Sequence, residues 1–135
     1  MKINLVKSIS DTSDNIPDHN NIAIDQIDEI ANTICQSIII ENVLQYLSLE
    51  QLEIVLSKMR HGGTITINCI DMLEIAQALY WGKINLDQLS SLVSGSVRYH
   101  SIIETKNFLE QRGYIIEQAN INIESFSFLI KAKRS

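Results

Sequence analysis

The stretch SKMRHGGTITINCID, residues 57–71, decides the fold that the rest of the chain must fit. A helical pattern runs into His61-Gly62-Gly63, and the β-branched run TITINCI (64–70) follows at once. Glycine adopts a left-handed backbone conformation at little cost, and helices commonly end at such a residue. We therefore predict that Gly62 ends a helix, that Gly63 allows a tight turn, and that residues 64–70 form a strand.

Five further segments have the composition of β-strands. Runs that are apolar at consecutive positions are typical of strands buried on both faces. The last two segments are separated by a gap of hairpin length, residues 122–124, so we expect them to pair in an antiparallel manner. The five predicted strands are KINLV (2–6), NIAID (21–25), SIIIEN (37–42), YIIEQANI (114–121) and SFSFLIKA (125–132).

Three predicted helices lie between these strands, and each begins at a capping pattern of Ser or Asp followed three residues later by Glu or Gln. The pairs are Ser48 with Gln51, Asp71 with Glu74, and Ser101 with Glu104, and Gly113 ends the last helix. The apolar positions expected to face the core are Leu49, Leu52, Val55, Leu56 and Met59 in the first helix and Leu73, Ala76, Leu79 and Tyr80 in the second.

The alternation of strands and helices predicts an α/β fold, a Rossmann-like three-layer sandwich. Its sheet has about six strands, is mainly parallel, and ends in an antiparallel hairpin. The chain of 135 residues is interpreted as one domain, 1–135, because its length suits a single core.

Composition limits the classes of function. The net charge of −5 disfavours nucleic-acid and anionic-membrane partners. No signal-peptide pattern opens the sequence and no apolar run spans a bilayer, so we expect a cytoplasmic protein. Cys35 and Cys69 lie in apolar runs and are predicted to be reduced core residues. His19, His61 and His100 have no metal-ligand spacing with them, so no metal site is predicted.

At this point the sequence resembles a known family. The buried strand that runs into ENVLQYL (41–47), the helix after it, MRHGG (59–63), TITINCID (64–71) and LEQRGYIIEQANI with FSFLIKAKR resemble the C-terminal half of class I S-adenosylmethionine-dependent methyltransferases. The resemblance covers residues 21–134 and includes the double glycine and Gly113-Tyr114. It implies S-adenosylmethionine as cofactor, and the family's strand order with its third strand removed implies the order 2-1-3-4-6-5.

The resemblance also suggests cofactor-binding residues at the carboxyl edge of the sheet, where open α/β sheets bind ligands. Asp25 ends the second predicted strand, where the family's acidic residue binds the ribose; alternatively it caps the following helix. Glu41 and Asn42 follow the central strand, and the alternative for them is a polar strand exit. Asp71 ends the next strand at the same edge, where helix capping explains it fully.

The segment 78–100 follows the strand after which the family often carries acceptor-binding insertions. Trp81, Arg98, Tyr99 and His100 could line an acceptor pocket or a subunit interface, and ordinary helical packing is the alternative for Trp81. The acceptor would be a small molecule or a glycan. No catalytic residue is identified, because an activated sulfonium donor requires mainly proximity and orientation from the protein.

Two departures from the family pattern leave two interpretations of the function open. The first strand runs into KSISDTSDN, and Lys7, Ser8, Ile9 and Ser10 stand where the family has a glycine-rich loop. The chain is therefore either a methyltransferase with a divergent cofactor site or a non-catalytic binding or assembly module, a pseudoenzyme. The chain is also too short to contain one strand and one helix of the family. Their omission should leave one edge of the sheet uncovered, and an uncovered edge predicts a homo-oligomer.

Overall fold

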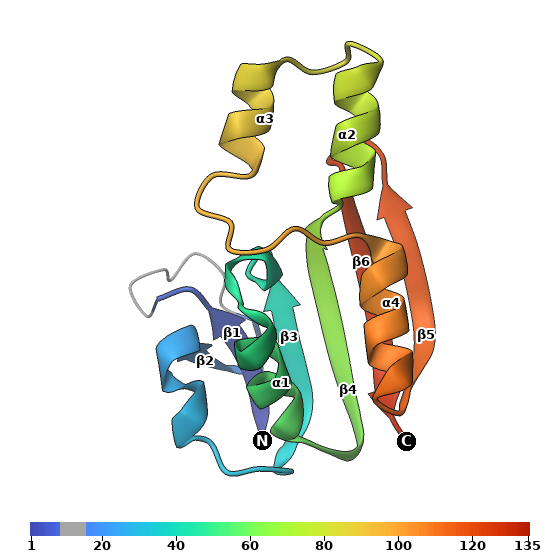
Figure 1. Cartoon of the computed structure of the whole chain (residues 1–135). Coiled ribbons are helices and arrows are strands. Elements are labelled where there is room, and N and C mark those ends of the chain that lie inside the picture. Colours follow the sequence, from blue (N-terminus) through green and yellow to red (C-terminus); the bar gives the residue numbers. More distant parts are fainter. Residues whose placement is uncertain (9–15) are drawn as a thin grey trace.

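Six strands form a single sheet in the order β2-β1-β3-β4-β6-β5 in the computed structural model, which describes residues 1–8 and 16–135 (Figure 1). β1, β2, β3 and β4 run parallel, whereas β6 is antiparallel to both β4 and β5. The predicted α/β class, the mainly parallel sheet of six strands with its antiparallel hairpin, and the strand order are confirmed. The strands are β1 (Lys2–Val6), β2 (Asn20–Ala23), β3 (Cys35–Glu41), β4 (Met59–Ile70), β5 (Tyr114–Asn122) and β6 (Ser127–Arg134).

The helical segments begin largely where the capping patterns predict. Ser48 Oγ accepts a hydrogen bond from the Gln51 backbone N–H at 3.2 Å, and Gln51 Oε1 accepts one from the Ser48 N–H at 2.9 Å. None of the helices within the described residues is long and apolar enough to cross a bilayer. The segments are the 3₁₀-helices η1 (Ile24–Glu29) and η2 (Leu44–Tyr46) and the helices α1 (Leu49–Ser57), α2 (Met72–Tyr80), α3 (Leu86–Leu92) and α4 (Ile102–Gln111).

The double glycine has a different role from the predicted one. α1 ends at Ser57 and β4 begins at Met59, so Gly62, at φ +77°, lies within a strand and does not end a helix. Pairing of β4 with β3 shifts here from Cys35–Met59 to Ser37–Thr64, which sets five steps along β4 against two along β3. The two glycines belong to a β-bulge, in which extra residues of one strand are accommodated by a positive φ.

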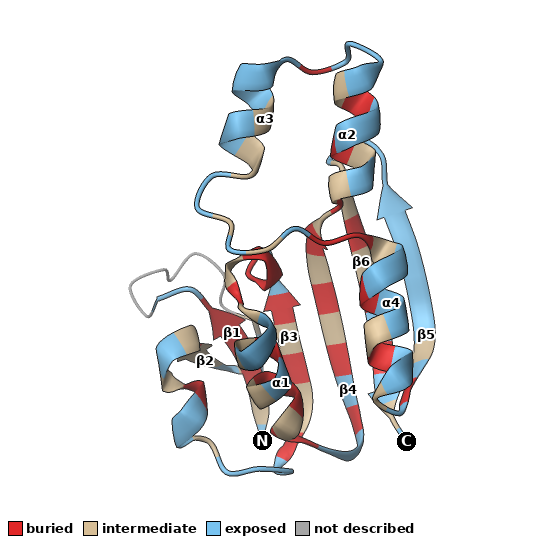
Figure 2. Ribbon diagram, viewed as in Figure 1, coloured by how far each residue is buried: buried red, intermediate tan, exposed pale blue. Residues whose placement is uncertain are grey.

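The main core lies on the face of the sheet that α1 and α4 cover (Figure 2). Successive residues of a strand point to opposite faces, and burial alternates accordingly along β4 and β6. On the opposite face of these two strands, Thr64, Lys131 and Lys133 are exposed. The fully buried core side chains include Ile38, Ile40, Ile65, Ile67, Phe128 and Ile130.

Residues 72–99, which contain α2 and α3, project beyond the carboxyl ends of β3 and β4 and are called the insertion below (Figure 1). The insertion has its own small cluster around the buried residues Ile75, Ala78 and Ile84. The predicted apolar face of α2 is wrong in part, because Leu73, Ala76 and Tyr80 are exposed and Ile75 is buried instead. The apolar partners of α2 include Phe126, from a distant part of the chain, and the periodicity of α2 does not reveal this contact.

Asp71 attaches the insertion to the sheet. Its Oδ1 accepts hydrogen bonds from the Leu73 and Glu74 N–H groups at 2.9 and 3.1 Å, as predicted for a helix cap. Its Oδ2 accepts a third from the Ile102 N–H at 2.9 Å, at the start of α4. One buried carboxylate therefore holds the first turns of two helices.

Candidate functional site

A pocket of about 300 Å³ opens at the carboxyl ends of β1 and β3. β1 and β3 are neighbours in the sheet, and the connection from β1 leads to β2 on one side of this pair whereas the connection from β3 leads to β4 on the other side. Open α/β sheets bind ligands at such a switch point. Three segments line the pocket: the end of β1 with Lys7, the end of β3 with Asn42 and Val43, and Tyr46 of η2.

Lys7 follows β1 directly and extends over the Tyr46 ring, with Nζ 4.2 Å from the ring centroid. This cation–π contact holds a positive charge inside the pocket. The loop after α3 lies close to this contact, because a Cβ atom on Gly95 would lie 3.7 Å from Tyr46 Cε1 and 4.0 Å from Lys7 Nζ. The backbone N–H groups of Val97 and Arg98 both donate to the Gln45 carbonyl oxygen and fix this loop against η2.

Glu41 and Asn42 line the pocket at the edge of the sheet, where the sequence places them. Asn42 has φ 55°, and asparagine tolerates this left-handed conformation better than most residues. Its backbone N–H donates to the Asn68 carbonyl oxygen at 2.7 Å, which turns the chain sharply out of β3. Both side chains are exposed to solvent at the pocket, and their role toward a cofactor remains a prediction.

Asp25 lies at the same edge but not at the position predicted for it. β2 ends at Ala23, so Asp25 is in the first turn of η1, with its side chain exposed. The alternative that it caps a helix is wrong, because η1 begins after Ala23, whose N–H donates to Gln26 Oε1 at 3.4 Å. Asp25 is not among the residues that line the pocket. Ribose binding by this side chain remains a prediction.

Trp81, Arg98, Tyr99 and His100 do not line a common pocket. Trp81 follows α2, is 67% exposed, and contacts the Tyr80 ring edge-on at 5.4 Å between centroids. Arg98 and His100 line a separate cavity of about 130 Å³ that also involves Leu52 and Phe108 of the two covering helices. Tyr99 is exposed. The helical-packing alternative for Trp81 does not describe a ring so open to solvent.

The Tyr46 ring is the pocket residue that the sequence interpretation did not single out. Tyr46 lies in ENVLQYL, which carries part of the family resemblance, and this position was its one sequence signal. Its partners Lys7 and Gly95 are each at least 39 positions away in the sequence, and the sheet and the insertion loop bring them together. Local pattern alone could not have identified the contact.

The described titratable groups do not form a metal site or a thiol site at this edge. In residues 1–8 and 16–135, no three side chains of His, Cys, Asp or Glu are close enough together to hold a metal ion. Cys35 and Cys69 are buried free thiols, as predicted for core residues. Burial raises the pKa of Cys69 to about 12, so this thiol is not a nucleophile at neutral pH.

His100 is buried and holds the end of the insertion against η2. Burial, reinforced by the nearby charge of Arg98, lowers its pKa to about 4, and a hydrogen bond with the Leu44 backbone opposes this shift. Nε2 has no hydrogen-bond partner in the structure, so the bond to Leu44 uses the other ring nitrogen. The ring is therefore neutral at pH 7.

The lowered pKa predicts a loss of stability in mild acid. Between pH 6.5 and 4 the unfolded chain binds a proton at His100 that the folded chain does not, so the free energy of unfolding falls as pH falls through this window. The expected contribution is about 3 kcal/mol, at about 1.4 kcal/mol for each pKa unit. Urea unfolding of wild type and His100→Gln at several pH values measures it.

The variant His61→Gln, at an exposed position, serves as the matched control and is expected to keep the wild-type pH dependence. If His100→Gln loses stability between pH 6.5 and 4 as steeply as wild type, the protonation of His100 is not the cause.

Solved structures with the same fold are S-adenosylmethionine-dependent methyltransferases. The enzyme from Mesorhizobium loti matches with a TM-score of 0.66 and 13% identity, over 98% of this chain and 80% of that one. The enzyme from Archaeoglobus fulgidus matches with a TM-score of 0.58 and 15% identity, over 98% and 75%. Magnesium protoporphyrin IX methyltransferase from Synechocystis, with bound SAH, matches with a TM-score of 0.58 and 13% identity, over 87% and 52%.

These likenesses establish the class I methyltransferase fold. The present chain spans about half the length of the Synechocystis enzyme. No family model and no curated protein matches the sequence.

Proposed function

We propose that this chain is a methyltransferase-like protein in which the pocket between β1 and β3 is a divergent S-adenosylmethionine site. The observation that carries the proposal is the place of this pocket, at the switch point of a class I methyltransferase sheet. By the resemblance, Lys7 begins the stretch that stands where the family has its glycine-rich loop, and Ile9 and Ser10 of that stretch lie outside the described residues. We interpret this pocket as a modified form of the family's cofactor site.

The residues present suit the nucleoside half of the cofactor. Tyr46 offers an aromatic surface, and Glu41 and Asn42 offer hydrogen-bonding groups at the pocket rim. Asp25, two residues beyond β2, would be the acceptor for ribose hydroxyl groups. These side chains would bind and orient a nucleoside at the carboxyl edge.

The methionine half does not fit. That half carries a positive sulfonium, a positive ammonium and a negative carboxylate group, so its net charge is positive, and Lys7 places a further positive charge in a pocket of about 300 Å³. Like charges in one pocket repel each other, and the exposure of Lys7 to solvent weakens this repulsion without removing it. The Lys7 side chain also fills space that glycine would leave open. We therefore derive no methyl-transfer step for this chain. A small-molecule or glycan acceptor would be needed only if the chain were an active methyltransferase.

The second candidate function is a non-catalytic binding or assembly module. It is favoured by the ring pair Tyr80 and Trp81, which are 82% and 67% exposed. Aromatic side chains are enriched at protein interfaces, and this pair supports the proposal that the chain associates with itself.

Isothermal titration calorimetry tests the divergent site. We expect wild type to bind S-adenosylmethionine with a Kd weaker than about 100 µM, roughly −5.5 kcal/mol. Lys7→Gly is expected to bind at least about tenfold more tightly, a change of about 1.4 kcal/mol, because it removes both the charge and the bulk. Lys7→Met retains the bulk without the charge, so the difference between the two variants separates the two causes.

S-adenosylhomocysteine, which lacks the sulfonium charge, is the matched ligand and should be affected less by Lys7. If wild type binds S-adenosylmethionine with a micromolar Kd and Asp25→Ala loses this binding, the proposal is overturned. The chain is then explained as a methyltransferase with a working cofactor site. Weaker binding in Lys7→Met would also contradict it, since Lys7 would then hold the ligand carboxylate.

A further inference from the structure

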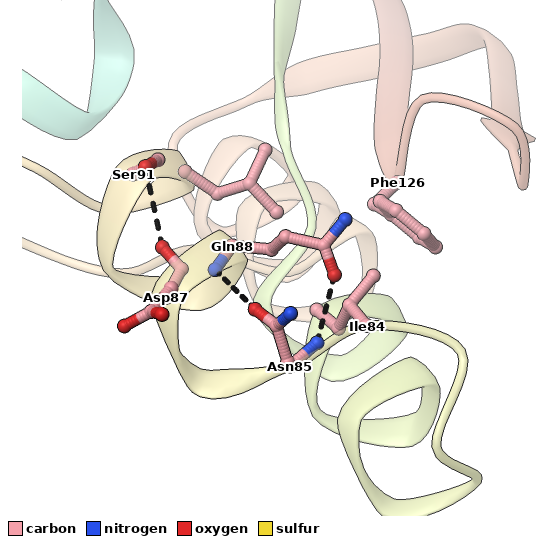
Figure 3. A pocket seen from close by; sticks show the side chains of 7 residues that line it. Ile84, Asn85, Asp87, Gln88, Ser91 and Phe126 are labelled. Carbon is pink, nitrogen blue, oxygen red and sulfur yellow. Dashed lines mark hydrogen bonds between the residues drawn. The ribbon is translucent and has the colours of Figure 1, made fainter.

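The hydrogen bond between Ser37 and His19 differs in kind from the capping bonds of the helices. At a hollow of about 510 Å³ beside α3, Asn85 Oδ1 and Gln88 Oε1 each accept a hydrogen bond from the other residue's backbone N–H at 2.8 Å (Figure 3). These amide groups hold the end of a helix. Ser37 and His19 instead bring a hydroxyl group and an imidazole ring together, with 2.9 Å between Ser37 Oγ and His19 Nε2.

The other nitrogen of the His19 ring determines which atom of this pair donates. His19 Nδ1 lies 2.9 Å from the carbonyl oxygen of Pro17, which can only accept a hydrogen bond. Nδ1 therefore carries the proton, and in the neutral imidazole Nε2 is an acceptor. Ser37 Oγ–H donates to it. A hydroxyl group, a base within hydrogen-bond reach and a third group that orients the base form the pattern of an activated nucleophile.

The sheet places this pair where a substrate can reach it. Ile38 and Ile40 of β3 belong to the main core, so Ser37 points to the opposite face of the sheet from α1 and α4. His19 directly precedes β2, and its ring extends across β1 to reach Ser37 on β3. Both residues are half-buried, so the pair is held in place and still contacts solvent.

Ser37 has a hydrogen-bond donor on each neighbouring strand. Lys2 of β1 and Thr64 of β4 are its Cα partners in the two strand pairings. Such partners point to the same face of the sheet, and their strands lie about 5 Å apart. When a hydroxyl oxygen attacks a carbonyl group, negative charge develops on the carbonyl oxygen, and nearby donors stabilise it. The Lys2 ammonium group and the Thr64 hydroxyl group are the candidates for this role.

The face of the sheet around Ser37 is basic. Lys131 and Lys133 are exposed on it, and Lys2 is half-buried. Asp18 and Glu41 flank the pair along the chain, but both are exposed, so water and salt weaken their charge. A negatively charged substrate is therefore favoured. The two rows of side chains that cross the strands at Ser37 and next to it contain three lysines and no acidic residue: Lys2, Ser37, Thr64, Lys133 and Ile115, then Asn4, Ile39, Thr66, Lys131 and Gln118.

We propose that Ser37 and His19 form a hydrolytic site for small esters whose acyl group carries a negative charge. Ser37 Oγ attacks the ester carbonyl carbon while its proton passes to His19 Nε2. The bond to the alcohol oxygen breaks, and the alcohol leaves with that proton. Water then attacks the acyl-serine, its proton passes through Nε2 to Ser37 Oγ, and the free acid is released. This site lies near the start of β3, away from the β1–β3 pocket at the end of that strand, and does not require S-adenosylmethionine.

Hydrolysis of 4-nitrophenyl hemisuccinate by the purified chain, followed as release of 4-nitrophenolate, tests the proposal. Ser37→Ala and His19→Gln should each lower the rate at least about a hundredfold, because general base catalysis contributes about 10²–10⁴-fold. Ser127→Ala is the matched control and should keep the wild-type rate, since Ser127 is also half-buried but bonds to Ser125 Oγ. Ser37→Cys keeps a nucleophile beside His19 and should still be acylated, which separates loss of the hydroxyl group from loss of the fold.

Mass spectrometry after quenching with acid should find the succinyl group on Ser37. Lys2→Gln should reduce the preference for the hemisuccinate over 4-nitrophenyl butyrate by about threefold, since a partly exposed charge acts weakly. Equal hydrolysis by wild type and Ser37→Ala, or a succinyl group found only on lysine side chains, would overturn the proposal. Equal rates for the two esters in wild type would contradict the requirement for a negative charge. None of these results depends on the S-adenosylmethionine titration.

Discussion

Replacing Asp71 with alanine is expected to lower the free energy of unfolding by about 3 kcal/mol, because a hydrogen bond to a charged group contributes roughly 1.5–3 kcal/mol and three backbone groups lose their partner. Asp71 is 1% exposed, so water does not readily replace the carboxylate. The N–H groups of Leu73, Glu74 and Ile102 all lose a hydrogen bond in this variant. Urea unfolding followed by circular dichroism measures the loss.

Two further variants show which part of the carboxylate matters. Asp71→Asn keeps an acceptor for the first turn of α2 but sets an NH₂ group against the Ile102 N–H. Its free energy of unfolding should therefore fall less than that of Asp71→Ala. Ser48→Ala removes an ordinary cap of one helix and should cost about 1 kcal/mol. A loss in Asp71→Ala no greater than that in Ser48→Ala would contradict the idea that this residue joins two helices.

Replacing Gly63 with alanine is expected to destabilise the protein by about 3 kcal/mol, at the upper end of the cost of overpacking a core. An added Cβ atom would lie 2.4 Å from Met59 Sδ and 2.9 Å from the Cys35 carbonyl oxygen. The methionine side chain can move aside, whereas the backbone oxygen is held by the pairing of β3 with β4. Thermal and urea unfolding of the purified variant measure the effect.

Gly62→Ala provides the neighbouring comparison. A Cβ atom there meets no other atom within 4 Å, but φ is +77°, so the cost is backbone strain of about 1–2 kcal/mol. Gly63→Ala should therefore be the more damaging of two alanine substitutions that are adjacent in the sequence. The reverse order would mean that the bulge in β4 is not packed as described.

Local chemistry explains why much of the fold could be predicted from the sequence. Ser48 and Asp71 cap helices through hydrogen bonds within three residues of themselves, so their patterns are sufficient. Gly62 shows the limit of this reasoning, because a glycine after a helix and a glycine in a bulge share a positive φ. Only the pairing of β4 with β3 distinguishes the two roles, and that pairing joins residues far apart in the sequence.

The same limit applies to the candidate site. Glu41 and Asn42 could be placed at the carboxyl edge because Glu41 ends a recognisable strand and Asn42 directly follows it. The contact of Lys7 with Tyr46 depends on two chain segments that the sheet brings together, and no local pattern predicts it. Phe126 was missed for a similar reason, since the cluster of the insertion that it packs against comes from another part of the chain.

The insertion leaves the sheet and returns to it at nearly the same point. Met72 is the first residue of the insertion, and His100 directly follows its last residue. The Met72 N–H donates to the His100 carbonyl oxygen at 2.8 Å. Segments whose ends lie together are those that proteins most readily accept as transplants, because the host chain need not rearrange to close the gap. Residues 72–99 are thus a segment suited to exchange in protein engineering. A short linker between Asp71 and His100 could replace them, or a different module could be inserted there, because none of the six strands lies within the exchanged residues.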